Sequence, residues 1–230
     1  MKTLGILGGV GPQTTSEVYL EIINLIRNGG SKIYPPILIY NLPFPFVVEK
    51  EAIVDGVNSE RMIPYLTNGA KILEKAGADF VVLPCNTLHK FSDDIISAIK
   101  IPFVSIVDET ALFLEKNKIK NVGLLGTETT VRDKIYNSSL EKAGIDIIYP
   151  NKDEQNILNN IIIELIRNGK SDSYAVLLQN ICESLRARGA ESILLACTDL
   201  QLLVSNLKIS IPVFDTTKIL VESSVKNILG

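Results

Sequence analysis

The chain has 230 residues, of which 46% are hydrophobic and 21% are charged, and its formal net charge is −3. Scattered lysines and arginines argue against a nucleic-acid surface, which needs clustered basic residues. No apolar run approaches the roughly 20 residues that a membrane span requires. Three cysteines in so long a chain argue against a disulfide framework. We therefore expect a cytoplasmic protein with free thiols that binds a small molecule and neither nucleic acid nor membrane.

Short apolar runs, many of them β-branched, alternate along the chain with longer stretches of helical spacing. Uninterrupted apolar runs are typical of strands buried on both faces of a parallel sheet. Eight runs are therefore predicted to be strands: Leu4–Leu7, Ile37–Tyr40, Phe80–Leu83, Phe103–Ile106, Val122–Leu125, Ile145–Tyr149, Ile193–Ala196 and Pro212–Phe214. The clearest predicted helices are Ser16–Arg27, Ile63–Ala76 and Tyr174–Arg188. Strands that alternate with helices predict right-handed βαβ units and an α/β fold. The first run is interpreted as a strand and not as a signal peptide, because a glycine pair follows it at once.

Two segments of the chain repeat one another without a gap. Residues 77–87 align with residues 189–199, so that Cys85 and Cys197 occupy equivalent places. A shorter match pairs Gly5-Ile6-Leu7-Gly8 with Gly123-Leu124-Leu125-Gly126. We therefore predict two similar lobes related by pseudo-twofold symmetry, each a mostly parallel sheet flanked by helices.

The predicted first lobe covers residues 1–100, and residues 208–230 return to it. The predicted second lobe covers residues 101–207. One continuous doubly wound sheet is the alternative architecture.

Each repeated cysteine follows an apolar strand and precedes a predicted helix, which places it at the carboxyl edge of a parallel sheet, where α/β proteins bind their ligands. A helix N-terminus lowers the pKa of a nearby thiol, and the first N–H groups of the helix are available to a carboxylate. A buried cysteine at a strand end is also common without any chemical role, but its occurrence in both halves favours chemistry. Two thiols on opposite sides of a carbon suit one task, in which one removes a proton and the other delivers one.

Four segments together resemble the aspartate/glutamate racemases that need no pyridoxal phosphate, and most of all aspartate racemase. They are Leu7-Gly8-Gly9-Val10-Gly11-Pro12, Pro84-Cys85-Asn86-Thr87-Leu88-His89, Gly123-Leu124-Leu125-Gly126-Thr127 and Leu195-Ala196-Cys197-Thr198-Asp199. The resemblance spans the whole chain. It implies racemisation of aspartate or glutamate by a two-base mechanism, without cofactor or metal, in a homodimer that binds a small acidic amino acid. It also implies catalytic roles for Cys85 and Cys197 and substrate contacts at Val10, Asn86, Thr87, Thr127 and Thr198.

The sequence departs from the resembling aspartate racemases at the residues that hold the substrate side chain. Val10 stands where the family commonly has methionine, and residues 41–48 contain no arginine or lysine, although relatives carry an arginine there. Glu164 stands where some relatives have a lysine. We therefore expect weaker selectivity for aspartate, with glutamate or a neutral polar amino acid as a competing substrate.

Other interpretations fit part of the sequence. A hydantoin racemase or a maleate cis–trans isomerase would also use two cysteines, and a non-catalytic amino-acid-binding protein could share the fold but would not need both thiols. His89, the only histidine, is interpreted as a helix-surface or capping residue, or as a group that promotes the Cys85 thiolate or holds a substrate carboxylate. Cys182 is expected to be a core residue of a helix. A zinc site is not expected, because zinc ligands usually come in closely spaced pairs.

Overall fold

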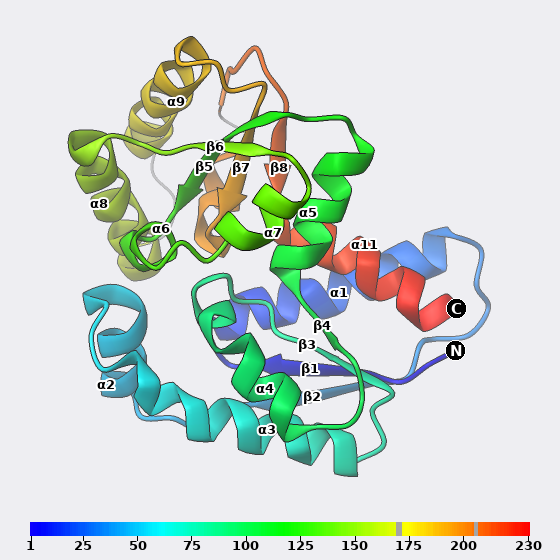
Figure 1. Ribbon diagram of the computed structural model, residues 1–230. Coiled ribbons are helices and arrows are strands. Elements are labelled where there is room, and N and C mark those ends of the chain that lie inside the picture. The colour runs from blue at the N-terminus through cyan, green and yellow to red at the C-terminus, as the bar shows by residue number, and fades with distance from the viewer. Residues whose placement is uncertain (169–171, 205–206) are drawn as a thin grey trace. The chain divides into compact units, whose positions relative to one another are not determined.

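The computed structural model describes residues 1–168, 172–204 and 207–230, which form two compact units (Figure 1). The first unit contains residues 1–109 and 217–230, and the second contains residues 110–216. Each unit holds a four-stranded sheet whose neighbouring strands are all parallel. The α/β class predicted from the sequence is therefore confirmed. In the described part of the chain, no helix has the length and apolar character needed to cross a membrane.

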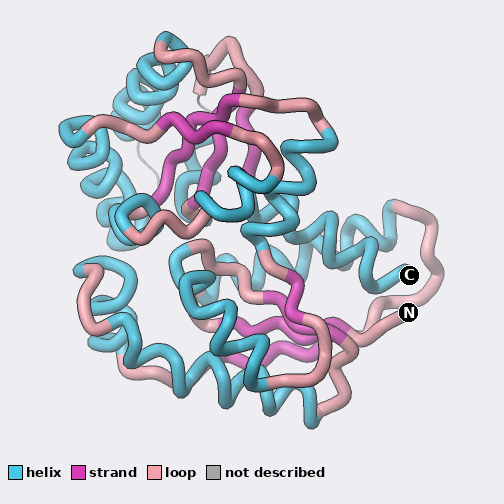
Figure 2. The backbone as a smooth tube through the Cα atoms, viewed as in Figure 1, coloured by secondary structure: helices cyan, strands magenta, loops and turns pink. Residues whose placement is uncertain are grey.

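The sheet of the first unit has the order β2-β1-β3-β4. Its strands are β1 (Leu4–Gly8), β2 (Ile37–Asn41), β3 (Phe80–Val82) and β4 (Phe103–Val104). The connecting helices are α1 (Pro12–Asn28), α3 (Ile63–Lys75) and α4 (Ser92–Ala98). Because parallel connections are right-handed, the reversal of direction after β2 puts α1 on one face of this sheet and α3 and α4 on the other. Figure 2 shows the strands of the sheet enclosed by these helices.

Between β2 and α3 the chain forms three short helical elements. They are α2 (Phe46–Glu49), a π-helical segment η1 (Lys50–Asp55) and a 3-10 turn η2 (Ser59–Met62). They pack against one another. Their side chains Val48, Ala52 and Met62 are buried in a hydrophobic cluster that also contains the buried residues of α3. The segment is thus anchored by its apolar side chains although it contributes no strand.

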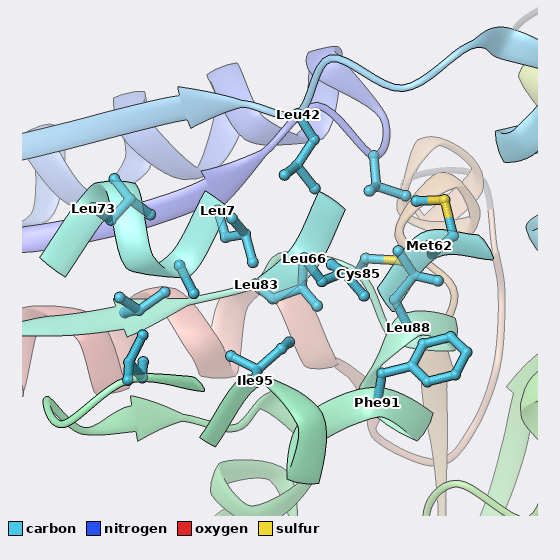
Figure 3. Packing of buried hydrophobic residues seen from close by; sticks show 14 of the residues in the cluster. Leu7, Leu42, Met62, Leu66, Leu73, Leu83, Cys85, Leu88, Phe91 and Ile95 are labelled. Carbon is cyan, nitrogen blue, oxygen red and sulfur yellow. The ribbon is translucent and has the colours of Figure 1, made fainter. Parts of the chain in front are cut away.

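A hydrophobic cluster of the first unit lies between the sheet and the pair α3 and α4 (Figure 3). Helix α3 buries Leu66, Gly69, Ala70 and Leu73, the spacing of one helical face. A Cβ atom on Gly69 would lie 2.6 Å from Leu7 Cδ1, so the glycine permits the close approach of α3 to β1. Each fully buried leucine contributes about 1.5–3 kcal/mol through the apolar area that it removes from water.

The sheet of the second unit has the order β6-β5-β7-β8. Its strands are β5 (Asn121–Gly126), β6 (Asp146–Ile148), β7 (Ser192–Ala196) and β8 (Val213–Asp215). The helices between them are α6 (Glu128–Arg132), α7 (Asn137–Lys142), α8 (Lys152–Asn168), α9 (Asp172–Ala187) and α10 (Gln201–Val204). Taken in chain order, the two sheets have the same strand order, so that β3 and β7 occupy the same place in each. The internal repeat seen in the sequence is therefore a repeat of topology.

Two helices begin in one unit and continue in the other. Helix α5 (Ile106–Lys116) follows β4, and α11 (Thr216–Leu229) follows β8. In the second unit, Phe113 of α5 packs edge-on against Phe214, with ring centroids 5.1 Å apart. In the first unit, the Lys2 N–H donates to the Ile228 carbonyl at 2.9 Å. The predicted strand 103–106 is too long by two residues, because the chain turns after Val104 and Ile106 already belongs to α5.

Candidate active site

Cys85 lies at the carboxyl end of β3, three residues after the strand ends. Its N–H donates to the Leu83 carbonyl at 2.8 Å, and its side chain lies in the core cluster with Leu66 and Leu88 (Figure 3). The expectation of an α-helix directly after Cys85 is wrong. A 3-10 turn, η3 (Thr87–Phe91), comes first, and α4 begins only at Ser92. A single short turn has a smaller dipole than a full helix, so it stabilises a thiolate less than the sequence led us to expect.

His89 ties the backbone of Cys85 to the start of α5. Its Nδ1 lies 2.7 Å from the Cys85 carbonyl oxygen, and its Nε2 lies 3.1 Å from the Ile106 nitrogen. Because the Ile106 N–H can only donate, Nε2 accepts and Nδ1 carries the proton. The ring also stacks on Phe103 at 5.4 Å between centroids. His89 thus links the chain after β3 with the chain after β4.

The expectation of a helix-surface histidine is wrong, because His89 is 5% exposed. The alternative of a capping histidine fits the structure, since Nε2 accepts a hydrogen bond from the first N–H of α5. Burial lowers the pKa of His89 from 6.5 to about 4, and the hydrogen bond to Cys85 and the charge of Asp108 offset only part of this effect. The ring is therefore neutral near pH 7. A neutral imidazole whose two nitrogens already have backbone partners does not act as a cation for the Cys85 thiolate or for a substrate carboxylate.

The turn between β1 and α1 forms the neighbouring part of the same sheet edge. Gly9 has φ of 97°, and a Cβ atom there would lie 2.8 Å from the Leu42 nitrogen. The Gly9 N–H donates to Thr15 Oγ1 at 3.1 Å, which fixes the turn against the first turn of α1. Val10 is buried in the same cluster as Cys85.

Four of the predicted site residues therefore lie in the first unit, after the adjacent strands β1 and β3. All four are at least nine-tenths buried: Val10, Cys85, Asn86 and Thr87. The structure thus brings them to one edge of one sheet.

Cys197 occupies in the second unit the place that Cys85 has in the first. It follows β7 directly in an extended conformation and is 7% exposed, as Cys85 is. Its Sγ donates to Asp199 Oδ2 at 3.8 Å, and Thr198 is half-buried. The element that follows is again a 3-10 turn, η4 (Thr198–Leu200), instead of an α-helix.

Thr127 follows the neighbouring strand β5 and caps α6. Its Oγ1 accepts a hydrogen bond from the Thr130 N–H at 3.1 Å, so this hydroxyl already stabilises the helix start. Gln155 of α8 reaches the same strand end, where its Nε2 donates to the Gly126 carbonyl at 3.1 Å and to Asn159 Oδ1 at 2.9 Å. Thr127, Cys197 and Thr198 are thereby assembled at the carboxyl edge of the second sheet.

Sequence reasoning missed two residues of this edge. Asp199 is part of the repeated segment, and an acidic side chain two residues after a candidate thiol was a signal that could have identified it. Gln155 lies far from the motifs in sequence, and no local pattern marks it. Only the fold brings it to the end of β5.

The third cysteine has a different environment. Cys182 of α9 is fully buried in the core of the second unit, and desolvation raises the pKa of its thiol to about 12. It therefore stays protonated, and the expectation of a core helix residue is confirmed.

Residues 41–48 and Glu164 provide no cation for a substrate carboxylate. Val48 is buried, whereas Phe46 and Val47 are 88% and 54% exposed. Glu164 accepts a hydrogen bond from the Tyr174 hydroxyl at 3.4 Å, between α8 and α9. The chain therefore lacks, at these positions, the positive charge that would favour an acidic side chain.

Known proteins share both the sequence and the fold. Residues 7–224 match the model of the Asp/Glu/Hydantoin racemase family. The broad specificity amino-acid racemase RacX of Bacillus subtilis (strain 168) is 32% identical over 99% of this chain and 98% of its own length. Two solved structures cover 100% of both chains. They are a putative Asp/Glu racemase from Yersinia pestis, with a TM-score of 0.88 and 31% identity, and an aspartate racemase homologue from Pyrococcus horikoshii OT3, with a TM-score of 0.81 and 32% identity. The chain belongs to the Asp/Glu/hydantoin racemase family and is an isomerase of the racemase type.

Proposed function

We propose that this enzyme racemises amino acids with Cys85 and Cys197 as its two acid–base groups. The observation that carries the proposal is topological. The two cysteines follow β3 and β7, which hold the same place in two sheets of the same order. Both thiols are free of disulfides and keep a small exposed surface, as a group that must meet a substrate requires.

In the proposed reaction, one cysteine starts as a thiolate and removes the α-proton from one face of the substrate. The electron pair of the broken C–H bond passes into the carboxylate, and the other cysteine delivers its thiol proton to the opposite face. Each thiol is base in one direction and acid in the other, so the same two residues serve both enantiomers. A positioned base contributes about 10²–10⁴-fold to such a step.

The remaining rate enhancement must come from groups that stabilise the negative charge as it grows on the substrate carboxylate. Asn86 and Thr87 in the first unit, with Thr127 and Thr198 in the second, are the candidates for this role. Each lies at the same sheet edge as the thiol of its unit. Their amide, hydroxyl and backbone N–H groups can donate to oxygen.

We propose a substrate range wider than aspartate and glutamate. Residues 41–48 carry no cation, and position 164 is a glutamate instead of the lysine that some of the resembling racemases carry. The printed description of the Bacillus subtilis relative as a broad specificity amino-acid racemase supports this range. Because the family also includes hydantoin racemases, a 5-substituted hydantoin belongs among the substrates tested.

The decisive experiment measures exchange of the α-proton in deuterated water for every common amino acid and one hydantoin. We expect exchange and racemisation of several amino acids by the wild-type enzyme and loss of both in Cys85→Ser and Cys197→Ser, because a serine hydroxyl is too weak an acid to replace a thiol. Full activity in either folded serine variant would contradict the two-thiol assignment. Exchange with the hydantoin alone would contradict the amino-acid assignment.

A further inference from the structure

The two thiols lie at equivalent places but have different neighbours. In the gapless repeat, the residue two positions after Cys85 is Thr87, whereas the residue two positions after Cys197 is Asp199. The carboxylate of Asp199 accepts a hydrogen bond from Cys197 Sγ at 3.8 Å. The second half of the repeat therefore places a negative charge beside its thiol, where the first half has a neutral hydroxyl.

On the strand next to β7, Asp215 of β8 is a further buried carboxylate. Two helices pack against η4. They are α8 and α10, and α10 has no titratable residue. On α8, the carboxylates of Glu154 and Glu164 bind Arg188 and Tyr174 respectively. Two further charged residues of α8, Lys152 and Asp153, are exposed to solvent.

A carboxylate at this distance favours the neutral thiol of Cys197 over its thiolate. For two unit charges 3.8 Å apart, Coulomb repulsion shifts the equilibrium from thiolate toward thiol by about sixfold at the dielectric constant of water. At an effective dielectric constant near 20, the shift is about a thousandfold. A thiol that donates to the carboxylate also gains a hydrogen bond that the thiolate cannot make.

We propose that Asp199 is a positioning residue that keeps Cys197 protonated in the resting enzyme, so that Cys197 starts as the acid and Cys85 as the base. This proposal rests on the two-thiol function proposed above. After one turnover the Cys85 thiolate has become a thiol, and the Cys197 thiol has become a thiolate. The resting form returns when Cys85 releases its proton to solvent and Cys197 takes one up.

The test is the rate of alkylation of each cysteine by iodoacetamide, which reacts with the thiolate, followed by peptide mass spectrometry across a range of pH. In the wild type near pH 7, we expect Cys85 to react faster than Cys197. In Asp199→Asn, the rate at Cys197 should rise by about sixfold or more, the lower limit set by Coulomb repulsion in water, while the rate at Cys85 stays unchanged. Asp199→Glu retains the charge and should keep Cys197 slow.

The matched control is Asp153→Asn, which makes the same change of charge at an exposed residue of α8 and should leave both rates unchanged. If Asp199→Asn does not fold, Asp199→Ser replaces it with the same expected rise. A rise below about sixfold at Cys197 in a folded variant overturns the proposal. Since alkylation needs no turnover, a clear rise in a protein without α-proton exchange would support the role of Asp199 and reject the proposed racemisation.

Discussion

Replacing His89 by glutamine should remove a pH dependence from the stability of this enzyme. The pKa of His89 is about 4 in the folded protein and 6.5 for an ordinary histidine. Between these values the unfolded chain binds more protons than the folded chain, so acidification destabilises the fold. With these two pKa values, linkage lowers the free energy of unfolding by about 2 kcal/mol between pH 7 and pH 5 through His89 alone.

The assay is urea denaturation of wild type and His89→Gln at pH 5, 6 and 7. Glutamine keeps a polar side chain of similar reach but does not titrate, so the difference between the two pH profiles isolates the imidazole. Carboxylates titrate in both proteins and cancel. His89 is the only histidine in the chain, so no second imidazole contributes.

We expect His89→Gln to be less stable than wild type at pH 7 by about 1–3 kcal/mol, because the buried Ile106 N–H or the buried Cys85 carbonyl loses its hydrogen bond to the imidazole. This difference in the free energy of unfolding should shrink by about 2 kcal/mol at pH 5, because the wild type is destabilised there by holding its imidazole neutral while the unfolded chain is protonated. Parallel profiles that differ by a constant to within about 0.5 kcal/mol would refute the reasoning. His89 would then be protonated as easily in the folded protein as in the unfolded chain.

Three further predictions concern the reaction and its substrate. Cys182→Ala should keep full racemase activity, with a free energy of unfolding lower by about 1 kcal/mol; a folded but inactive variant would assign Cys182 to the chemistry. Dialysis against a chelator and hydroxylamine should leave activity intact, and activity that returns only with added pyridoxal phosphate would contradict a thiol mechanism. Val47→Arg should raise kcat/KM for aspartate relative to alanine by about 10- to 100-fold, the effect of one charge-assisted contact, and an unchanged ratio would place the side-chain pocket elsewhere.

The sequence by itself determined the fold class and the candidate thiols. All eight apolar runs contain a strand. The inner strands β1, β3, β5 and β7 are buried on both faces and are therefore apolar at nearly every position, which leaves an uninterrupted signal. The gapless match between residues 77–87 and 189–199 predicted that Cys85 and Cys197 lie at equivalent positions after β3 and β7. Segments with the same order of glycine, apolar strand residues and cysteine adopt the same local structure. The core helix position of Cys182 followed from helical spacing in the same way.

Tertiary structure alone decided the surroundings of those residues. The run 103–106 ends as a strand at Val104, and Ile106 starts α5 with its N–H bound to His89. The pattern of apolar residues carries no information about this contact, because every residue type except proline supplies the same N–H. The neutral state of His89 likewise depends on burial by distant segments and not on its neighbours in sequence.

The same limit applies to the second thiol. The motif around Cys197 contains Asp199, but only the extended backbone of Cys197 followed by a 3-10 turn brings the carboxylate within 3.8 Å of the sulfur. Gln155 of α8 contacts the end of β5. The sequence pattern of this helix predicts which of its faces is buried but not which strand that face contacts. Local patterns fix strands, helices and the thiols at their ends because short-range sterics and burial dictate them. Groups such as Gln155 and the Ile106 N–H come from segments that are distant in sequence and are joined to their partners only by packing, so the three-dimensional fold decides these contacts.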